Sequence, residues 1–287
     1  MRRSLLGVIL VALLCGRAAA QTPEPQAGWI ADKGGCKVWD AYPLPNETVS
    51  WSGPCKDGLA NGKGVVQWFA DGKPSDRYEG EYLNGHSNGY GVYTWADGGR
   101  YEGEFRAGLM TGRGVKTQLS GTRYEGEFKD GVENGHGAYL FANGDRYEGE
   151  FKDGRQSGHG VSVTAAGIRY DGAWQDGRQQ GQGTLTWPNG DRYQGDFKAG
   201  KRAGHGVFVW AAGGRYDGEW KDDARNGHGV QSWAGGSYDG EWKNDKPDGQ
   251  GTRRDADGDL FAGTWVAGCF KQGTLRAALD VDLAKCP

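Results

Sequence analysis

The chain has 287 residues, of which 36% are hydrophobic and 54 are glycine. Its 34 basic and 37 acidic residues give a formal net charge of −3, so it has no excess of positive charge with which to bind the phosphates of a nucleic acid. Mean hydropathy is low and leucine is scarce, which argues against a thick two-layer hydrophobic core.

The first 20 residues have the pattern of a secretory signal peptide. Arg2 and Arg3 precede an apolar stretch over residues 5–14, and small residues end the segment at Ala20. A membrane anchor is the alternative, but about 10 apolar residues fall short of the roughly 20 that span a bilayer. We therefore expect cleavage after Ala20 and export to the periplasm or the extracellular space. Loss of three arginines with this segment leaves 31 basic and 37 acidic residues, a charge of −6.

Four cysteines remain in the mature chain, as one pair near each end. Cys36 and Cys55 precede the regular part of the sequence, and Cys269 and Cys286 follow it. In an exported protein this clustering predicts the disulfides Cys36–Cys55 and Cys269–Cys286, although four cysteines allow three connectivities. A zinc site is the alternative, but no CxxC motif occurs and no histidine lies near either pair in the sequence.

Between the cysteine pairs, a phrase that opens with an aromatic residue recurs about every 23 residues. Each copy starts with a segment such as Tyr-Glu-Gly-Glu-Phe-Lys and is followed by a Gly-x-Gly pair. The opening positions are Tyr78, Tyr101, Tyr124, Tyr147, Tyr170, Tyr193, Tyr216, Tyr238 and Phe261. A short fixed period indicates one supersecondary unit copied along the chain. We expect a leader at residues 21–50, about nine units plus a degenerate last one at 51–268, and a C-terminal cap at 269–287.

Each unit contains two short segments with the pattern of β-strands. In residues 146–152, Tyr147, Gly149 and Phe151 share one face because side chains alternate along a strand. The second strand contains the Gly-x-Gly pair, whose bare positions leave room for aromatic rings to lie across the backbone. The predicted fold class is therefore all-β: an elongated, single twisted antiparallel sheet of tandem β-hairpins with capped ends, whose aromatic stripe is the core.

The phrase and its copies resemble the membrane occupation and recognition nexus (MORN) repeat. In that family an aromatic residue is followed by glycine two residues later, by a second aromatic residue two beyond it, and by spaced glycines that end in Gly-x-Gly. Residues 124–146 fit this pattern, and the resemblance covers roughly residues 51–268. It implies a row of β-hairpins that serves as a scaffold, often for protein association and sometimes for membrane lipid.

Aligned histidines occupy the position between the paired glycines of four units: His136, His159, His205 and His228. Two strands per unit at ~4.8 Å place successive copies about 10 Å apart. Nitrogen ligands must lie ~2 Å from a shared zinc ion. The row therefore predicts no metal site. The segment 255–259 resembles the start of a calcium loop, but Leu260 stands where the required glycine should be.

An arginine precedes most of the opening tyrosines, as Arg146 precedes Tyr147. It shares its strand face with acidic residues such as Glu148 and Glu150. We interpret these charges as a solvated lattice of ion pairs across strands, with modest worth per pair.

The sequence contains none of the common catalytic motifs, so we expect no catalytic residue, no cofactor and no enzyme activity. The favoured function is a non-catalytic extracytoplasmic scaffold that binds a protein partner or itself through its long surface. The alternative is an envelope-associated module for glycan or membrane lipid head groups, in which exposed rings stack on the ligand. The candidate binding residues of the aromatic face are Trp95, Trp187, Trp210 and Trp233. Aromatic rows are more often core than platform, which favours the scaffold.

Overall fold

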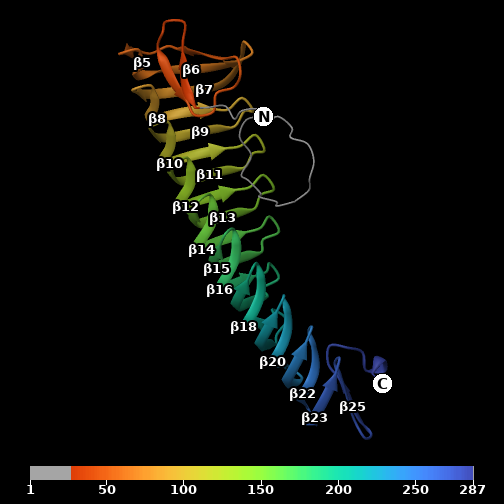
Figure 1. The fold of residues 1–287 in the computed structure, drawn as a ribbon. Helices are drawn as coiled ribbons and strands as arrows, with labels where there is room; N and C mark the ends of the chain where they lie inside the picture. Colours follow the sequence, from red (N-terminus) through yellow and green to blue (C-terminus); the bar gives the residue numbers. More distant parts are fainter. Residues whose placement is uncertain (1–26, 287) are drawn as a thin grey trace, which may run out of the picture. The chain divides into compact units, whose positions relative to one another are not determined.

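The computed structural model describes residues 27–286, which form β-strands and one short helix, η1 (Leu283–Lys285) (Figure 1). The expected signal peptide, residues 1–20, lies outside the described residues. The chain divides into two compact parts between Ala142 and Asn143, which are called the first unit and the second unit. The word unit otherwise means one 23-residue copy. Outside a small N-terminal sheet, consecutive strands of each unit pair antiparallel with their neighbours in sequence, so the predicted all-β fold of tandem hairpins is confirmed.

The first unit contains a small sheet and the opening hairpins of the array. The small sheet has the strand order β1-β2-β5-β4, with β1 Gly28–Ala31, β2 Lys37–Asp40, β4 Cys55–Lys56 and β5 Leu59–Ala60. The hairpin strands are β3 Glu47–Trp51, β6 Gly62–Ala70, β7 Lys73–Leu83, β8 His86–Thr94, β9 Arg100–Arg106, β10 Leu109–Thr117, β11 Arg123–Lys129 and β12 Val132–Leu140.

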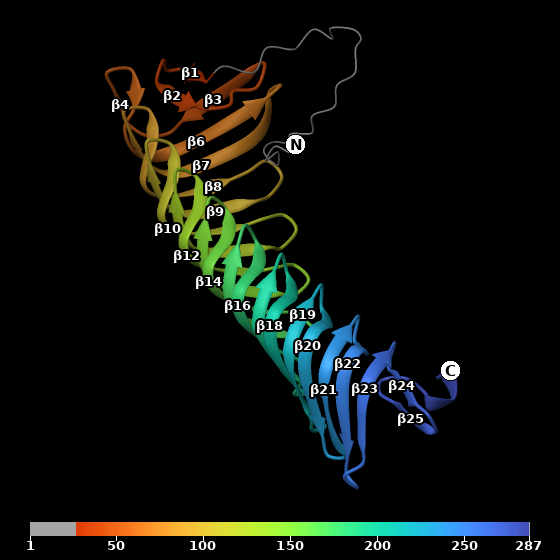
Figure 2. The same cartoon turned by 60° about the horizontal axis from the view of Figure 1, so that its bottom comes forward.

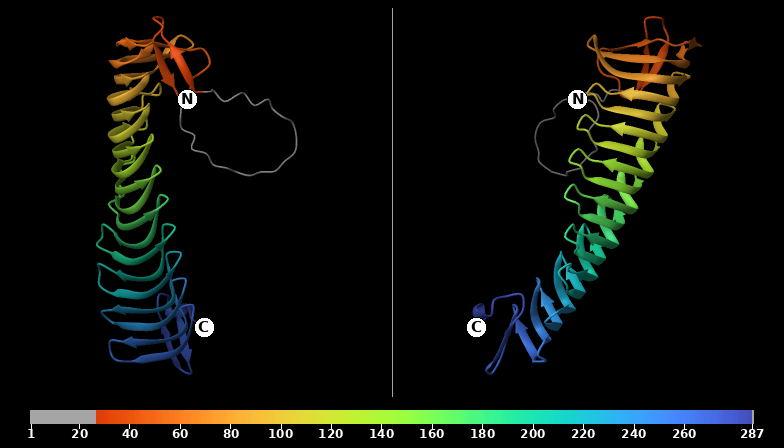
Figure 3. Two further views of the ribbon diagram at one scale, coloured as in Figure 1. Left: turned by 60° about the vertical axis from the view of Figure 1, so that its left-hand side comes forward. Right: turned by 180° about the vertical axis from the view of Figure 1, so that it is seen from behind.

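The second unit continues the same alternation and ends in a short hairpin. Its strands are β13 Arg146–Lys152, β14 Arg155–Val163, β15 Arg169–Gln175, β16 Arg178–Thr186, β17 Arg192–Lys198, β18 Lys201–Val209, β19 Arg215–Lys221, β20 Ala224–Trp233, β21 Gly236–Lys243, β22 Lys246–Asp255, β23 Leu260–Val266, β24 Cys269–Gln272 and β25 Leu275–Ala278. The hairpins are bowed rather than flat (Figure 3).

The leader contains more strand than its sequence indicated. The strands β1 and β2 belong to the small sheet, and β3 pairs with β6 of the first hairpin (Figure 2). The leader docks on the array through its backbone: Trp39 N–H donates to the carbonyl of Gly85 at 2.8 Å. A disulfide joins Cys36 to Cys55. These strands are only four or five residues long, which is too short for a local periodicity to mark them.

The opening tyrosine of each unit lies across two paired glycines. In one unit, Gly126 and Gly137 face each other on β11 and β12, and a Cβ built on Gly137 would come within 2.3 Å of the Tyr124 hydroxyl oxygen. That hydroxyl donates to the carbonyl of Glu127, three residues on, at 3.0 Å. The same bond recurs in the other seven tyrosine-opened units at 2.9–3.1 Å. Glycine is required here because any side chain would occupy the space of the ring.

The second aromatic residue of each unit links neighbouring units. The ring of Phe128 packs edge-on against Tyr124 of its own strand, with centroids 5.1 Å apart, and against Tyr101 of the preceding unit, at 4.9 Å. In the second unit, Trp174 makes the same pair of contacts with Tyr147 and Tyr170. Edge-to-face pairs each contribute about 0.5–1.5 kcal/mol beyond the area they bury. The tyrosines are almost completely buried in consequence, although the layer is only one sheet thick.

Both edges of the array are fastened by turns. Asp130 and Gly131, with φ of 51° and 87°, form a two-residue hairpin turn, and Gly131 N–H donates to the carbonyl of Met110 in the preceding unit. On the opposite edge, the Asp145 carboxylate accepts from the backbone N–H of Ala165 in the next unit at 2.8 Å. The same carboxylate bond recurs at Asp76 and Asp191, so these units bond a neighbour through the turn edge as well as through the strand ladder.

Substitution of Gly137 by alanine tests the ring-over-glycine contact. The added methyl would collide with the Tyr124 ring, so we expect a loss of about 1–3 kcal/mol in unfolding free energy, the usual cost of overpacking. Chemical denaturation followed by circular dichroism measures it. The matched control is Ala138→Val, which adds bulk to the next residue on the exposed face. Equal midpoints for the two variants would contradict the proposed role of the glycine.

The buried tyrosines also predict alkaline unfolding. Burial, followed by the neighbouring acidic side chain, raises the pKa of Tyr147 and of Tyr170 to about 12. Because the folded pKa exceeds the unfolded value of about 10, this stabilisation is complete below pH ~10 and is lost as pH rises through about 12. Tyrosinate absorbance and circular dichroism should therefore change together between these values. Ionisation of all tyrosines near pH 10 in a fully folded protein would refute the assignment.

Candidate functional site

The side of the sheet that bears the opening tyrosines is here called the aromatic face. The tyrosines are buried, but a second set of rings near the longer loops is only half-buried. All four tryptophans expected from the sequence belong to this second set: Trp95, Trp187, Trp210 and Trp233. Trp95 lies in the first unit, where its ring packs on Tyr93 at 5.1 Å. The other three lie in the second unit.

In the second unit the half-buried rings form a continuous patch around Phe208. Its ring lies 5.3 Å from that of Trp187 and 4.8 Å from that of Trp210. Trp187, Trp210 and Trp233 all pack against the buried core, and each keeps part of its surface exposed. The tryptophans therefore serve as core and as surface at once.

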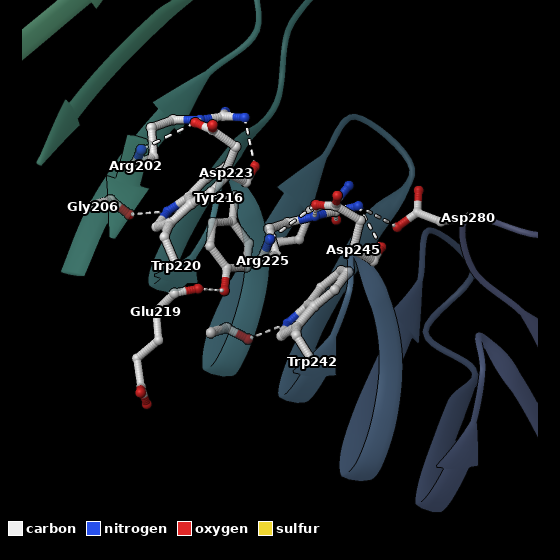
Figure 4. A network of polar contacts seen from close by, with 12 residues as sticks. Arg202, Gly206, Tyr216, Glu219, Trp220, Asp223, Arg225, Trp242, Asp245 and Asp280 are labelled. Carbon is white, nitrogen blue, oxygen red and sulfur yellow. Dashed lines mark hydrogen bonds and ion pairs between the residues drawn. The ribbon is translucent and has the colours of Figure 1, made fainter. Parts of the chain in front are cut away.

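Arginines lie beside this patch on the same face, in an arrangement that we call the arginine clasp. The guanidinium carbon of Arg202 lies 4.3 Å above the centroid of the Trp220 ring. Nε of Arg202 is 3.2 Å from Oδ1 of Asp223, and Nη2 donates to the Asp223 carbonyl at 2.6 Å (Figure 4). The aspartate belongs to the next unit, so the clasp joins two units by charge and by cation–π contact.

One unit further on, the clasp is repeated with almost the same geometry. The guanidinium carbon of Arg225 lies 4.2 Å above the Trp242 ring. Its Nε is 3.2 Å from Oδ1 of Asp245, and its Nη2 donates to the Asp245 carbonyl at 2.6 Å. Arg225 has a further partner, because its Nη2 also lies 3.1 Å from Oδ2 of Asp280 in the C-terminal cap (Figure 4).

The sequence carries a signal for the clasps that position-by-position reading missed. In the other hairpin turns, glycine follows a residue with positive φ, as in Asp153-Gly154. Asp223 and Asp245 replace this glycine and keep its positive φ, at 73° and 67°. Aspartate tolerates that region better than most residues, but it remains uncommon. Each of these aspartates follows, one unit later, an arginine that pairs with the second aromatic residue of its own unit. An arginine at that position together with an aspartate in place of the next turn glycine therefore indicates a clasp.

The C-terminal cap lies against this face of the second unit. After β25, Leu279 packs against the buried core, and Leu279 N–H donates to the carbonyl of Gly268 at 2.9 Å. Arg253 donates through Nη1 to the carbonyl of Ala278. A disulfide joins Cys269 to Cys286 and fastens the end of this segment. The backbone and side chain of a short peptide segment are thus bound by arginines of the aromatic face.

The aromatic face of the first unit has a different polar centre. Glu133 takes the place that Arg202 and Arg225 occupy in the second unit, and it is 6% exposed. Its carboxylate lies 3.1 Å from Nζ of Lys116 and accepts from the Tyr139 hydroxyl at 3.2 Å. The charges of Glu133 and Lys116 neutralise each other at this position of the aromatic face.

On the opposite face, the charges expected to pair across strands pair mainly along one strand. Arg123 Nη2 lies 2.6 Å from Glu125 of the same strand, and similar pairs recur at Arg77, Arg100, Arg169 and Arg215. A two-residue step places both side chains on one side of a strand. Pairs across strands, as inferred from the sequence, are also present, for example between Lys63 and Glu81. Exposed pairs of this kind contribute little to stability.

The aligned histidines and the acidic residue before the second aromatic position have structural partners. His159, His205 and His228 are exposed, and their Nε2 atoms lie 3.0–3.1 Å from aspartates of the following strand. The backbone N–H of His159 donates to the Glu150 carboxylate at 2.9 Å. That glutamate fills the bulge created by the positive φ of Gly158. Sequence reasoning had not assigned this role to the acidic residues.

The residues described, 27–286, contain no group of three or more histidine, cysteine or acidic side chains arranged to hold a metal ion. The acidic segment 255–259 forms the same loop as the other units, with Gly258 N–H donating to the carbonyl of Asp255. In the same part of the chain, no helix has the length and hydrophobicity needed to cross a bilayer.

Comparison with solved structures finds only distant likenesses. The TCP domain of SAS-4 (dCPAP) from Drosophila melanogaster, solved in complex with a proline-rich motif of Ana2, is 15% identical over 65% of this chain and 99% of that one, with a TM-score of 0.31. The TCP10 domain of CPAP from Danio rerio, in complex with a STIL peptide, is 10% identical over 77% and 100%, with a TM-score of 0.29. Neither value supports transfer of a function. No curated protein sequence matches the chain significantly.

The family comparison is specific. The MORN repeat matches nine segments of the chain: residues 56–72, 78–100, 101–123, 124–146, 147–169, 170–192, 193–215, 216–237 and 238–260. These segments cover more than half of the sequence, and eight of them begin at the opening tyrosines of the ring-over-glycine units described above. The chain therefore belongs to the MORN repeat family.

Proposed function

We propose that the protein is a non-catalytic scaffold that binds an extended segment of another protein on the aromatic face of its second unit. The carrying observation is that a segment of the chain itself lies there. Ala278 and Asp280 are bound by Arg253 and Arg225, while Leu279 packs on the core. A face that holds one peptide through a carbonyl, an apolar side chain and a carboxylate has the chemistry to hold another.

The half-buried tryptophans support the same proposal. Trp187, Trp210 and Trp233 present rings whose inner parts are fixed by packing and whose outer parts remain accessible. Rigid aromatic side chains contribute large contact area at low entropic cost, which is why such residues are enriched in protein interfaces. The surface also spans several units, as a scaffold requires.

Export of the mature chain belongs to the same proposal. The disulfides Cys36–Cys55 and Cys269–Cys286 support it, because disulfides persist in oxidising compartments. The signal-like pattern of residues 1–20 agrees with this location.

Photo-crosslinking in the protein's own compartment tests the proposed face. A benzoylphenylalanine placed at Trp210 should form a discrete, saturable crosslink to a polypeptide, because this position lies in the aromatic patch. The matched control is the same probe at Val209, the adjacent residue, which is 43% exposed on the other face. Equal crosslinking at both positions, or crosslinks from Trp210 to lipid or glycan alone, would contradict the proposal. A crosslink to a second copy of the chain would identify the partner as the protein itself.

A further inference from the structure

The C-terminal cap supplies a carboxylate to only one of the two arginine clasps. Arg225 also donates through Nη1 to the side-chain oxygen of Gln231, where the other clasp has Phe208. Arg225 pairs with Asp245 of the next unit and with Asp280 of the cap. Among the residues that the structure describes, Arg202 has an ion pair with Asp223 alone. The Arg202 side chain is correspondingly more exposed, at 18% against 10% for Arg225.

Arg202 lies beside apolar rings of the aromatic face. Its guanidinium carbon lies 5.7 Å from the centroid of Phe208, whose ring contacts Trp187 and Trp210. The cap places Leu279 directly before Asp280, so an apolar side chain enters the face beside the carboxylate. At Arg202, Phe208 stands where Gln231 stands beside Arg225, so the rings of Phe208 and Trp210 offer an apolar surface next to a similar cation.

We infer that Arg202, with Phe208 and Trp210, is a subsite for an aspartate or glutamate side chain that follows an apolar residue in an extended segment of a partner protein. The inference rests on the proposed function and specifies the partner's chemistry. The cap is an example of such a ligand within the chain, because the Asp280 carboxylate pairs with Arg225.

Charge favours a single carboxylate over a polyanion at this subsite. Asp223 already neutralises much of the Arg202 charge, and the mature chain carries a formal charge of −6. Net repulsion disfavours nucleic acids and strongly anionic membranes. One carboxylate can still form a charge-assisted hydrogen bond with a fixed guanidinium in a partly desolvated place.

The experiment uses the mature full-length protein and a fluorescent peptide with the sequence of residues 274–284, which contains Leu279 and Asp280. The protein's own cap keeps the Arg225 position filled, because a tethered segment has a high effective concentration. The added peptide is therefore expected to bind at Arg202. Fluorescence anisotropy should show saturable binding.

Three comparisons decide the matter. Arg202→Gln should weaken binding about tenfold, the size expected for loss of one charge-assisted hydrogen bond. The matched control, Arg178→Gln, removes an exposed arginine from the opposite face and should change the affinity by less than about twofold. A peptide in which the residue corresponding to Asp280 is asparagine should lose about tenfold with the unmodified protein.

The inference is overturned if the unmodified peptide does not bind, or if Arg202→Gln and the asparagine peptide bind as tightly as their parents. Should Arg202→Gln fail to fold, as judged by circular dichroism, the asparagine peptide on the unmodified protein decides alone. Failure here is distinguishable from failure of the proposed function. A saturable crosslink from Trp210 to a protein that does not compete with the acidic peptide would leave the interaction face standing and remove the carboxylate subsite.

Discussion

A tyrosine ring that lies across two glycines of paired strands is the contact on which the eight tyrosine-opened units depend. The ring needs both bare positions, as Tyr124 needs Gly126 and Gly137, and its hydroxyl is satisfied by the carbonyl three residues along. The copy that precedes these eight units uses a variant of the same contact, in which the Trp51 ring lies over Gly53 and Gly64. A single sheet can bury large side chains in this way because the backbone itself supplies the surface against which they pack. The high glycine content is therefore a requirement of the core.

This construction separates positions that fold the chain from positions that are free to vary. The tyrosine, the paired glycines and the second aromatic residue recur because each unit packs on its neighbour. The positions that pair with the second aromatic residue are less constrained, and they hold Glu133 in the first unit but Arg202 and Arg225 in the second. Function on the aromatic face is therefore expected where units differ from one another. The clasps, three of the half-buried tryptophans (Trp187, Trp210 and Trp233) and the cap all lie in the second unit.

The period of the sequence was sufficient to predict the hairpins and the shared face of Tyr147 and Phe151. The clustering of the cysteines at the two ends predicted the disulfides that the structure contains. These features depend on local alternation and on spacing. The clasps could not be predicted in that way, since Arg202 and Asp223 are 21 residues apart and meet only because adjacent units are stacked in register. Residues that looked like rows of like charges also proved to be parts of pairs, as with His159 and Asp171. These contacts form between adjacent units. The sequence of one unit alone does not determine which side chains meet there.

The repetition of the clasp has a consequence for how such an array can change in length. Residues 216–237 form one complete unit. If they were deleted, the unit of Arg202 would directly precede the unit of Asp245, and the cap would keep its distance from the new neighbour. Arg202 would then occupy the place of Arg225, with Trp242 beneath it and both Asp245 and Asp280 beside it. The contacts between the last three units and the cap are therefore equivalent, so the array can lose one unit and still have the cap bound to its last units.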